Sequence, residues 1–127
     1  MIKDQIARKL VGAGWERAVF RHKKDKKLVI KVTHRHLSNE GNKMEWAIWN
    51  NAPDHIKKWL VPCVSIHDDG AYLVCARGKE VDKAPVNNPF SAIFHDMMMP
   101  ENWVNINGKT LLADYANKAM YDLYGKK

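Results

Sequence analysis

The first third of the chain has the hydrophobic pattern of β-strands. Residues 18–21 and 28–32 are short apolar runs on either side of a lysine-rich turn, and each predicts a strand. Because strand side chains alternate between faces, Lys31 should lie on the face opposite Ile30. Residues 1–10 fit either a short helix or a first strand, and we expect a glycine-marked turn at 12–14.

The middle of the chain changes to helical spacing. In residues 38–51, Met44 and Ile48 fall on one stripe, and Ser38 or Asn39 can act as the N-cap. Pro53 should end this helix, and residues 53–60 should form a further short helical turn. Two more strands, 61–67 and 71–76, are expected to pair around the Asp68-Asp69-Gly70 turn.

The last third begins with a predicted loop at 79–88. A helix is then expected over 89–98, with Pro89 near its first position. Residues 102–106 and 109–113 predict a second hairpin around Asn107-Gly108, a dipeptide typical of tight β-turns. A helix over 114–124 should close the chain, stopped by Gly125. This element order indicates an α+β fold with one domain over 1–127.

Composition and charge admit several partners. The net charge of +7 favours a polyanion such as nucleic acid or nucleotide phosphate, although the dense run 23–27 is also typical of a solvated hairpin tip. The chain has no run long enough to span a membrane, and residues 1–4 do not resemble a secretory signal. We therefore expect a cytoplasmic protein with free thiols at Cys63 and Cys75. Its histidines and cysteines lack the spacing of a zinc site.

Candidate chemistry begins with a glycine pattern. Gly12-x-Gly14-x-x-Arg17-x-Val19 fits a phosphate-binding loop in which Arg17 replaces the third glycine. On its own, such a pattern is often a plain turn. Lys31 follows within an apolar strand, where a buried lysine requires an anionic partner. Glu45 on the next helix is the expected partner, with Glu40 at the helix start as the alternative.

A second group of polar residues lies near the C-terminus. Asn102 precedes the hairpin around Asn107-Gly108, and Asp114 follows it. Because a hairpin returns the chain to its starting point, both side chains can point to one place. Their oxygen atoms are the ligand type that hard cations such as Mg²⁺ prefer.

Taken in order, these motifs resemble the protein-kinase-like superfamily over residues 10–116, and small phage-encoded truncated kinase-like proteins in particular. The resemblance implies a kinase N-lobe-like antiparallel sheet with a C-helix-like helix over 1–78. It implies a small C-lobe remnant over 79–127, formed by the catalytic loop and the Asp-Tyr-Ala hairpin. The implied cofactors are ATP and Mg²⁺, with Lys31 and Glu45 at the phosphates and Asn102 and Asp114 as metal ligands. The implied nucleotide-binding residues are Gly12, Gly14, Val19, Val29, Lys31, Cys75, Ala76 and Gly78.

The chain also departs from that family. Asp96 in Phe94-His95-Asp96 resembles the catalytic aspartate, but Phe94 replaces the usual histidine and the spacing to Asn102 is one residue too long. Either residues 97–99 contain a bulge, or Asp96 is not the catalytic base. The chain has no A-P-E motif and no helical platform for a peptide. Nucleotide binding is therefore better supported than phosphoryl transfer, and a minimal serine/threonine kinase-like enzyme stays open.

Three functions remain open at this level. The first is a Mg-ATP-binding kinase-like protein with weak or no phosphotransfer. The second is a catalytically inactive kinase-like protein that binds and inhibits a partner, such as a host protein if the chain is viral. The third is a basic nucleic-acid binder, for which we expect no strong sequence specificity. A homodimer that replaces the missing lobe also stays open.

Overall fold

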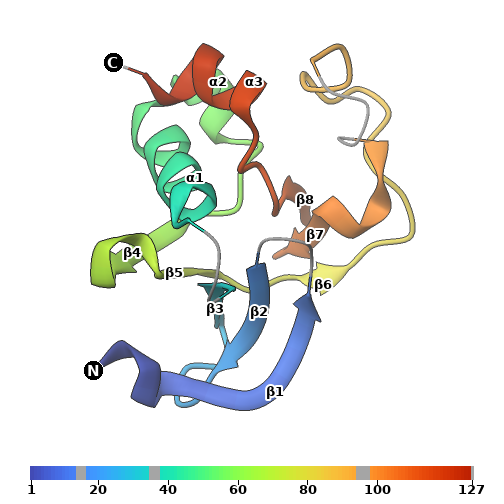
Figure 1. Cartoon of the computed structure of the whole chain (residues 1–127). Helices are drawn as coiled ribbons and strands as arrows, with labels where there is room; N and C mark the ends of the chain where they lie inside the picture. The colour runs from blue at the N-terminus through green and yellow to red at the C-terminus, as the bar shows by residue number, and fades with distance from the viewer. Residues whose placement is uncertain (14–16, 35–37, 94–97, 127) are drawn as a thin grey trace.

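The computed structural model describes residues 1–13, 17–34, 38–93 and 98–126, with only the backbone described at 8, 9 and 13. Within these ranges the chain is α+β. The strands form two antiparallel sheets, one in the order β1-β2-β3-β5-β4 and one in the order β6-β7-β8 (Figure 1). The first sheet contains β1 (Ile6–Ala13), β2 (Arg17–His22), β3 (Leu28–Thr33), β4 (Cys63–His67) and β5 (Tyr72–Ala76). The second contains β6 (Lys79–Glu80), β7 (Trp103–Ile106) and β8 (Lys109–Leu112).

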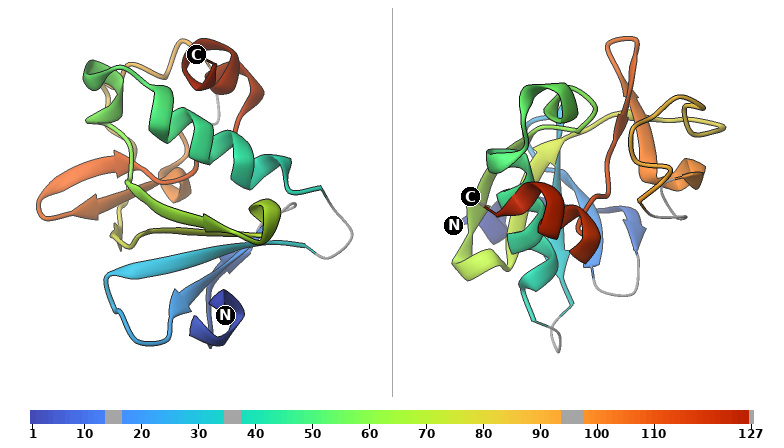
Figure 2. Two further views of the ribbon diagram at one scale, coloured as in Figure 1. Left: turned by 90° about the vertical axis from the view of Figure 1, so that its left-hand side faces the viewer. Right: turned by 90° about the horizontal axis from the view of Figure 1, so that it is seen from above.

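Helices cover one face of the larger sheet (Figure 2). The longest is α1 (Glu40–Asn51), which connects β3 with the short helix α2 (Asp54–Lys57). The C-terminal α3 (Lys118–Met120) continues as the π-helical turn η5 (Tyr121–Gly125), which packs on α1. The remaining short 3₁₀ turns are η1 (Ile2–Gln5), η2 (Asp68–Gly70) and η4 (Pro100–Asn102).

The core lies between the larger sheet, α1 and the C-terminal segment. Val29 and Cys75 from the sheet pack with Ile48 from α1 and with the fully buried Trp103 and Tyr115 from the C-terminal half. Ile30 is also fully buried but lies outside this cluster. The alternation in β3 therefore places Lys31 and Val29 together on the face toward α1, as the sequence predicts.

Both predicted hairpins are present. In the second, Asn107 (φ 52°) and Gly108 (φ 86°) adopt the left-handed backbone that a tight two-residue turn requires. The larger strands also agree with expectation, although β4 begins at Cys63 rather than at residue 61. Residues 1–10 contain both of the structures left open, because η1 leads directly into β1.

The helix expected over 89–98 is wrong for the described residues, since 89–93 form turns. The side chain of Asn88 explains the difference: its Nδ2 donates to the Pro85 carbonyl at 2.7 Å, and its Oδ1 accepts from the Phe90 amide at 2.8 Å. Such local side-chain bonds compete with helical ones. Phe90 is fully buried and meets the Trp103 ring, so tertiary packing also favours the turn.

The closing helix begins later than the sequence predicts. Residues 114–117 are not helical, and α3 starts at Lys118, capped by the Asn117 side chain, which accepts from the Met120 amide. Of the turn expected at 12–14, Gly12 and Ala13 lie within β1, with Gly12 opposite Val19, and Gly14 lies outside the described residues. Residues 79–88 contain the short strand β6 in place of an uninterrupted loop.

Candidate functional site

A buried ion pair lies where β3 faces α1. The Lys31 ammonium donates to Oε2 of Glu45 at 2.5 Å, and Lys31 and Glu45 are 6% and 0% exposed. The predicted pairing of these residues is therefore present. Glu40, the alternative partner, is exposed at the start of α1.

Each charge in this pair stabilises the other. Burial alone lowers the pKa of Lys31, but the attraction of Glu45 and the smaller contributions of Cys75 and Asp114 together outweigh burial and leave the pKa raised. Burial alone raises the pKa of Glu45, but Lys31 and Arg17 outweigh it and leave the pKa lowered. Both groups are therefore charged at neutral pH.

Arg17 on β2 is a second cation at Glu45. Its Nη2 donates to Glu45 Oε1 at 3.3 Å and to Asp114 Oδ1 at 2.9 Å, and its Nη1 donates to Asn42 Oδ1 at 3.0 Å. Burial alone lowers the pKa of the guanidinium, but Glu45 and Asp114 together outweigh burial and leave the pKa above its ordinary value. The sequence shows Arg17 only as a departure from the glycine pattern, with no indication of these partners.

The segment after β8 passes directly beside this pair. Lys31 Nζ also donates to the Ala113 carbonyl at 2.5 Å, and the Tyr115 amide donates to Glu45 Oε1 at 3.1 Å. The Ala113 amide donates to the Asn102 carbonyl at 2.7 Å. The backbone of Asn102 is thereby held beside the segment that carries Asp114.

The C-terminal hairpin is fixed in this position by the body of the fold. The Val61 amide donates to the Leu112 carbonyl at 3.0 Å, and the Leu112 amide donates to the Trp59 carbonyl at 2.8 Å. The Tyr115 hydroxyl donates to the Val61 carbonyl at 2.8 Å. These bonds hold residues 113–115 rigidly against Glu45.

The donor set for Mg²⁺ fits poorly in this arrangement. Magnesium requires a near-octahedral set of oxygen atoms at short range. Oδ1 of Asp114 already accepts from Arg17 Nη2 at 2.9 Å, so a metal at this oxygen would compete with the guanidinium. A divalent cation there would lie next to the guanidinium, and like charges repel.

The remaining expected nucleotide contacts are distributed over the first sheet and its exit. Val29 is buried in the core cluster, and Val19 is partly buried against it. The Ala76 amide donates to the Pro62 carbonyl at 3.0 Å, which removes it as a donor to a base. At Gly78 an added Cβ would lie 2.6 Å from the Val104 side chain, so the close approach of β7 requires glycine there. Gly12 has open space around it.

Cys75 lies directly beside the ion pair. Its Sγ is 3.9 Å from Glu45 Oε2 and 3.8 Å from Sγ of Cys63, and both cysteines are free thiols. Glu45, Cys63 and Cys75 together could hold a metal ion. Sequence spacing does not indicate this grouping, because strand pairing joins the two cysteines and α1 brings Glu45 to them. The hydrogen bond to Cys63 and burial raise the pKa of Cys75 well above its usual value, which disfavours the thiolate that metals bind.

Two of the expected site residues, Gly14 and Asp96, lie outside the described residues. Another residue, Asn42, emerges only from the structure. It is fully buried, and its Nδ2 donates to the Lys31 carbonyl at 3.1 Å and to the Gly70 carbonyl at 2.8 Å. Its position three residues before Glu45 on a helix was the available signal, since such residues share a face.

A scan against protein-family models found no matching family, and searches of curated proteins and of solved structures found no significant match. Among the described residues, no helix has the length and apolar character needed to cross a membrane.

Proposed function

We propose that this chain is a kinase-like protein that binds a nucleotide, with ATP as the expected ligand, and that it transfers phosphate weakly or not at all. The single observation that carries the proposal is the ion pair of Lys31 and Glu45. It joins the third strand to the following helix, the same element types that carry the paired lysine and glutamate of kinases.

The surroundings of the pair support a role beyond stability. Burying two opposite charges gives little net stabilisation compared with apolar residues of similar volume. A buried lysine held by a carboxylate is a costly element of a small core. Its placement beside Asp114, whose side chain is 57% exposed, leaves the charged cluster open to solvent at that end.

Thermal unfolding with and without Mg-ATP tests the proposal. A ligand that binds only the native state at a hundredfold excess over its Kd stabilises it by about 2.7 kcal/mol. For a domain of this size the melting temperature should rise on the order of 10 °C. No rise at millimolar ATP, with or without Mg²⁺, would contradict nucleotide binding.

Variants separate a specific site from general attraction of anions. Lys31→Ala should reduce the ATP-dependent shift. The shift is measured against the variant's own ligand-free melt, because the variant removes one of the two cations at Glu45. Lys24→Ala is the matched control, since Lys24 is an exposed lysine on the β2–β3 turn. An equal loss in both variants would indicate non-specific binding to a basic protein.

The weak phosphotransfer follows from positioning. Phosphoryl transfer depends mainly on holding both substrates in line, and the sequence offers no platform for a peptide. We expect turnover far below the range of about 1–100 s⁻¹ that kinases show. A radiolabelled transfer assay on peptide and on the chain itself measures it.

The second candidate is a kinase-like protein that acts by contact alone, for example on a host protein. The pairing of Arg17 with Asp114 favours it, because this contact occupies a carboxylate that a metal-bound nucleotide would use. A groove between α1 and the C-terminal helices offers a surface, lined by Glu40, Lys43, Met44, Ala47, Lys118 and Tyr121. An absent nucleotide shift together with a folded chain would favour this role.

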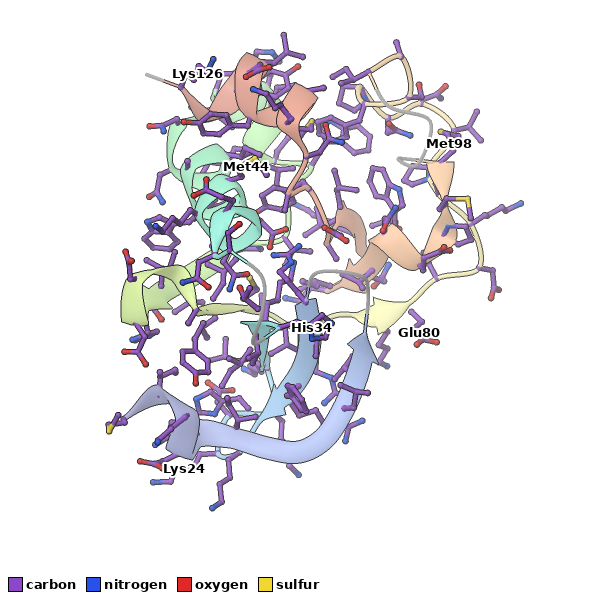
Figure 3. All side chains as sticks on the ribbon, viewed as in Figure 1. Lys24, His34, Met44, Glu80, Met98 and Lys126 are labelled. Carbon is purple, nitrogen blue, oxygen red and sulfur yellow. The ribbon has the colours of Figure 1, made fainter. Side chains whose placement is uncertain are left out.

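Nucleic-acid binding is the least supported function. Figure 3 shows Lys24 and Lys126 at opposite ends of the molecule, so these two lysines lie far apart. We expect only non-specific binding, with Kd of roughly 10⁻⁴ to 10⁻⁶ M at physiological salt. Nanomolar, sequence-dependent binding at that salt would make nucleic-acid binding the best supported of the three functions.

A further inference from the structure

The guanidinium of Arg17 occupies the position at Asp114 where the kinase resemblance expects a metal ion. Arg17 begins β2, and in the β2–β3 register it lies opposite Thr33, two residues from the pair of Val19 and Lys31. It therefore projects from the same face of the sheet as Lys31. Its Nη2 reaches Asp114 Oδ1 at 2.9 Å while it also contacts Glu45.

The fold contains a receptor for this guanidinium. The Asn42 amide nitrogen donates to the carbonyls of Lys31 and Gly70 and lies 3.3 Å from Oγ1 of Thr33. These bonds fix the orientation of the amide, so that its oxygen faces Nη1 of Arg17. Because Asn42 is fully buried, moving Arg17 away would leave that oxygen without its partner.

The charges of the cluster are already balanced. Lys31 and Arg17 contribute two positive charges, and Glu45 and Asp114 contribute two negative ones. A magnesium ion at Asp114 would add two positive charges beside a guanidinium that the fold holds in place. A polyphosphate anion would instead compete with Asp114, the most exposed of the four groups, for the Arg17 guanidinium.

We propose that Arg17 takes the place of the metal ion and that this site binds the polyphosphate of a nucleotide without magnesium. The inference rests on the proposed nucleotide-binding function. An arginine has five N–H donors, so the guanidinium can hold Asn42, Glu45 and Asp114 and still donate to a phosphate oxygen. The Arg17 side chain is 10% exposed and Asp114 beside it is 57% exposed, so the anion meets the cluster at this end, where the Asp114 carboxylate competes with it.

Calorimetric titration of the full chain with ATP, in excess EDTA and in excess Mg²⁺, tests the inference. The Kd in EDTA should equal the Kd in Mg²⁺ or be tighter, because free ATP carries more negative charge than its magnesium complex. Binding that is tenfold or more weaker in EDTA would overturn this inference and leave the proposed function standing. Absence of binding in both buffers would overturn the proposed function, and this inference with it.

The Asp114→Asn variant gives an opposite result for the two kinds of site. If Asp114 serves as a metal ligand, its loss abolishes the binding measured in Mg²⁺. If Asp114 is a partner of Arg17, its loss releases an N–H donor of Arg17 toward the phosphates. The Kd in EDTA should then stay within about threefold of the wild-type value or become tighter. A tenfold loss in EDTA would overturn the inference.

The Arg17→Gly variant restores the third glycine of the loop pattern. It should weaken ATP binding in EDTA at least tenfold and make the remaining binding depend on Mg²⁺. Circular dichroism shows whether Arg17→Gly folds. If Arg17→Gly does not fold, Arg17→Lys replaces it in the test, and this variant should retain metal-independent binding because it keeps a cation at this position. Lys24→Ala is the surface control, and a loss equal to that of Arg17→Gly would overturn the inference in favour of non-specific attraction.

Discussion

Two carboxylates in this molecule are each paired with two cations, in opposite environments. Glu45 contacts Lys31 and Arg17 inside the fold and is 0% exposed. Asp122 contacts Lys118 and Lys126 on the surface of the C-terminal segment, with 44% of its side chain exposed. The Asp122 contacts lie four residues apart along one segment, whereas the Glu45 contacts join three separate elements.

The difference shows why a count of ion pairs says little about stability. Water screens the Asp122 cluster, and local side-chain pairs of this kind contribute little. At Glu45 the charges have lost most of their water, so each one depends on its partners. One carboxylate with two cations is therefore replaceable at Asp122, whereas at Glu45 none of the charges can be removed without loss of stability.

Removing the Glu45 charge should produce the largest effect. Glu45→Gln keeps the shape but leaves Lys31 and Arg17 without their shared anion, and should destabilise the chain by about 3–5 kcal/mol. This is a large part of the total stability of a small domain. Urea unfolding followed by tryptophan fluorescence measures it. A change below about 1 kcal/mol would show that water reaches this cluster freely.

Acid should weaken the buried cluster selectively. Because the pKa of Glu45 is lowered in the folded state, its contribution is complete above its ordinary value of 4.5 and is lost as the pH falls through the folded pKa. Wild-type stability should therefore fall more steeply below about pH 4.5 than that of Glu45→Gln. Parallel stability–pH curves for the two proteins would contradict the assignment.

The alkaline limb follows with the opposite sign. Because the pKa of Lys31 is raised above 10.5, its contribution is complete below that value and is lost only as the pH rises through the folded pKa. Between the acid titration of Glu45 and the alkaline titration of Lys31, the pair should contribute the same stability at every pH. Urea unfolding of the wild type and Glu45→Gln at a series of pH values measures this contribution.

Tyr115→Phe should have a moderate effect. The hydroxyl donates to the Val61 carbonyl at 2.8 Å and lies 3.2 Å from Cys63 Sγ, in a residue that is 1% exposed. Its removal should cost about 1 kcal/mol, because one buried hydrogen bond is lost while the ring stays packed. An unchanged urea midpoint would show that the hydroxyl does not hold residues 113–115 in place.

Asp122→Asn should have the smallest effect. The variant keeps the size of the side chain and removes contacts that are exposed to water, so the urea midpoint should not change measurably. Added salt should change wild type and variant alike. A loss comparable to that of Glu45→Gln would remove the contrast between the two clusters.

Local sequence patterns predicted a large part of the fold and of the candidate site. The alternation in 28–32 placed Lys31 on the strand face opposite Ile30, and the kinase resemblance of the following helix indicated Glu45 as its partner. The Asn107-Gly108 turn followed from the left-handed backbone that these residues tolerate. The strand alternation and the turn depend on interactions within a few residues, so the sequence alone indicates them.

Tertiary structure alone decided the rest. Arg17 reaches Asp114 across 97 positions of sequence, and no local pattern indicates such a partner. The helix expected over 114–124 starts at Lys118 because Tyr115 must first enter the core and donate its amide to Glu45. The sequence thus determined which charged residues would lie inside the fold. Long-range strand pairing and burial determined which of them meet, because the partner of a buried charge is set by what the fold brings next to it.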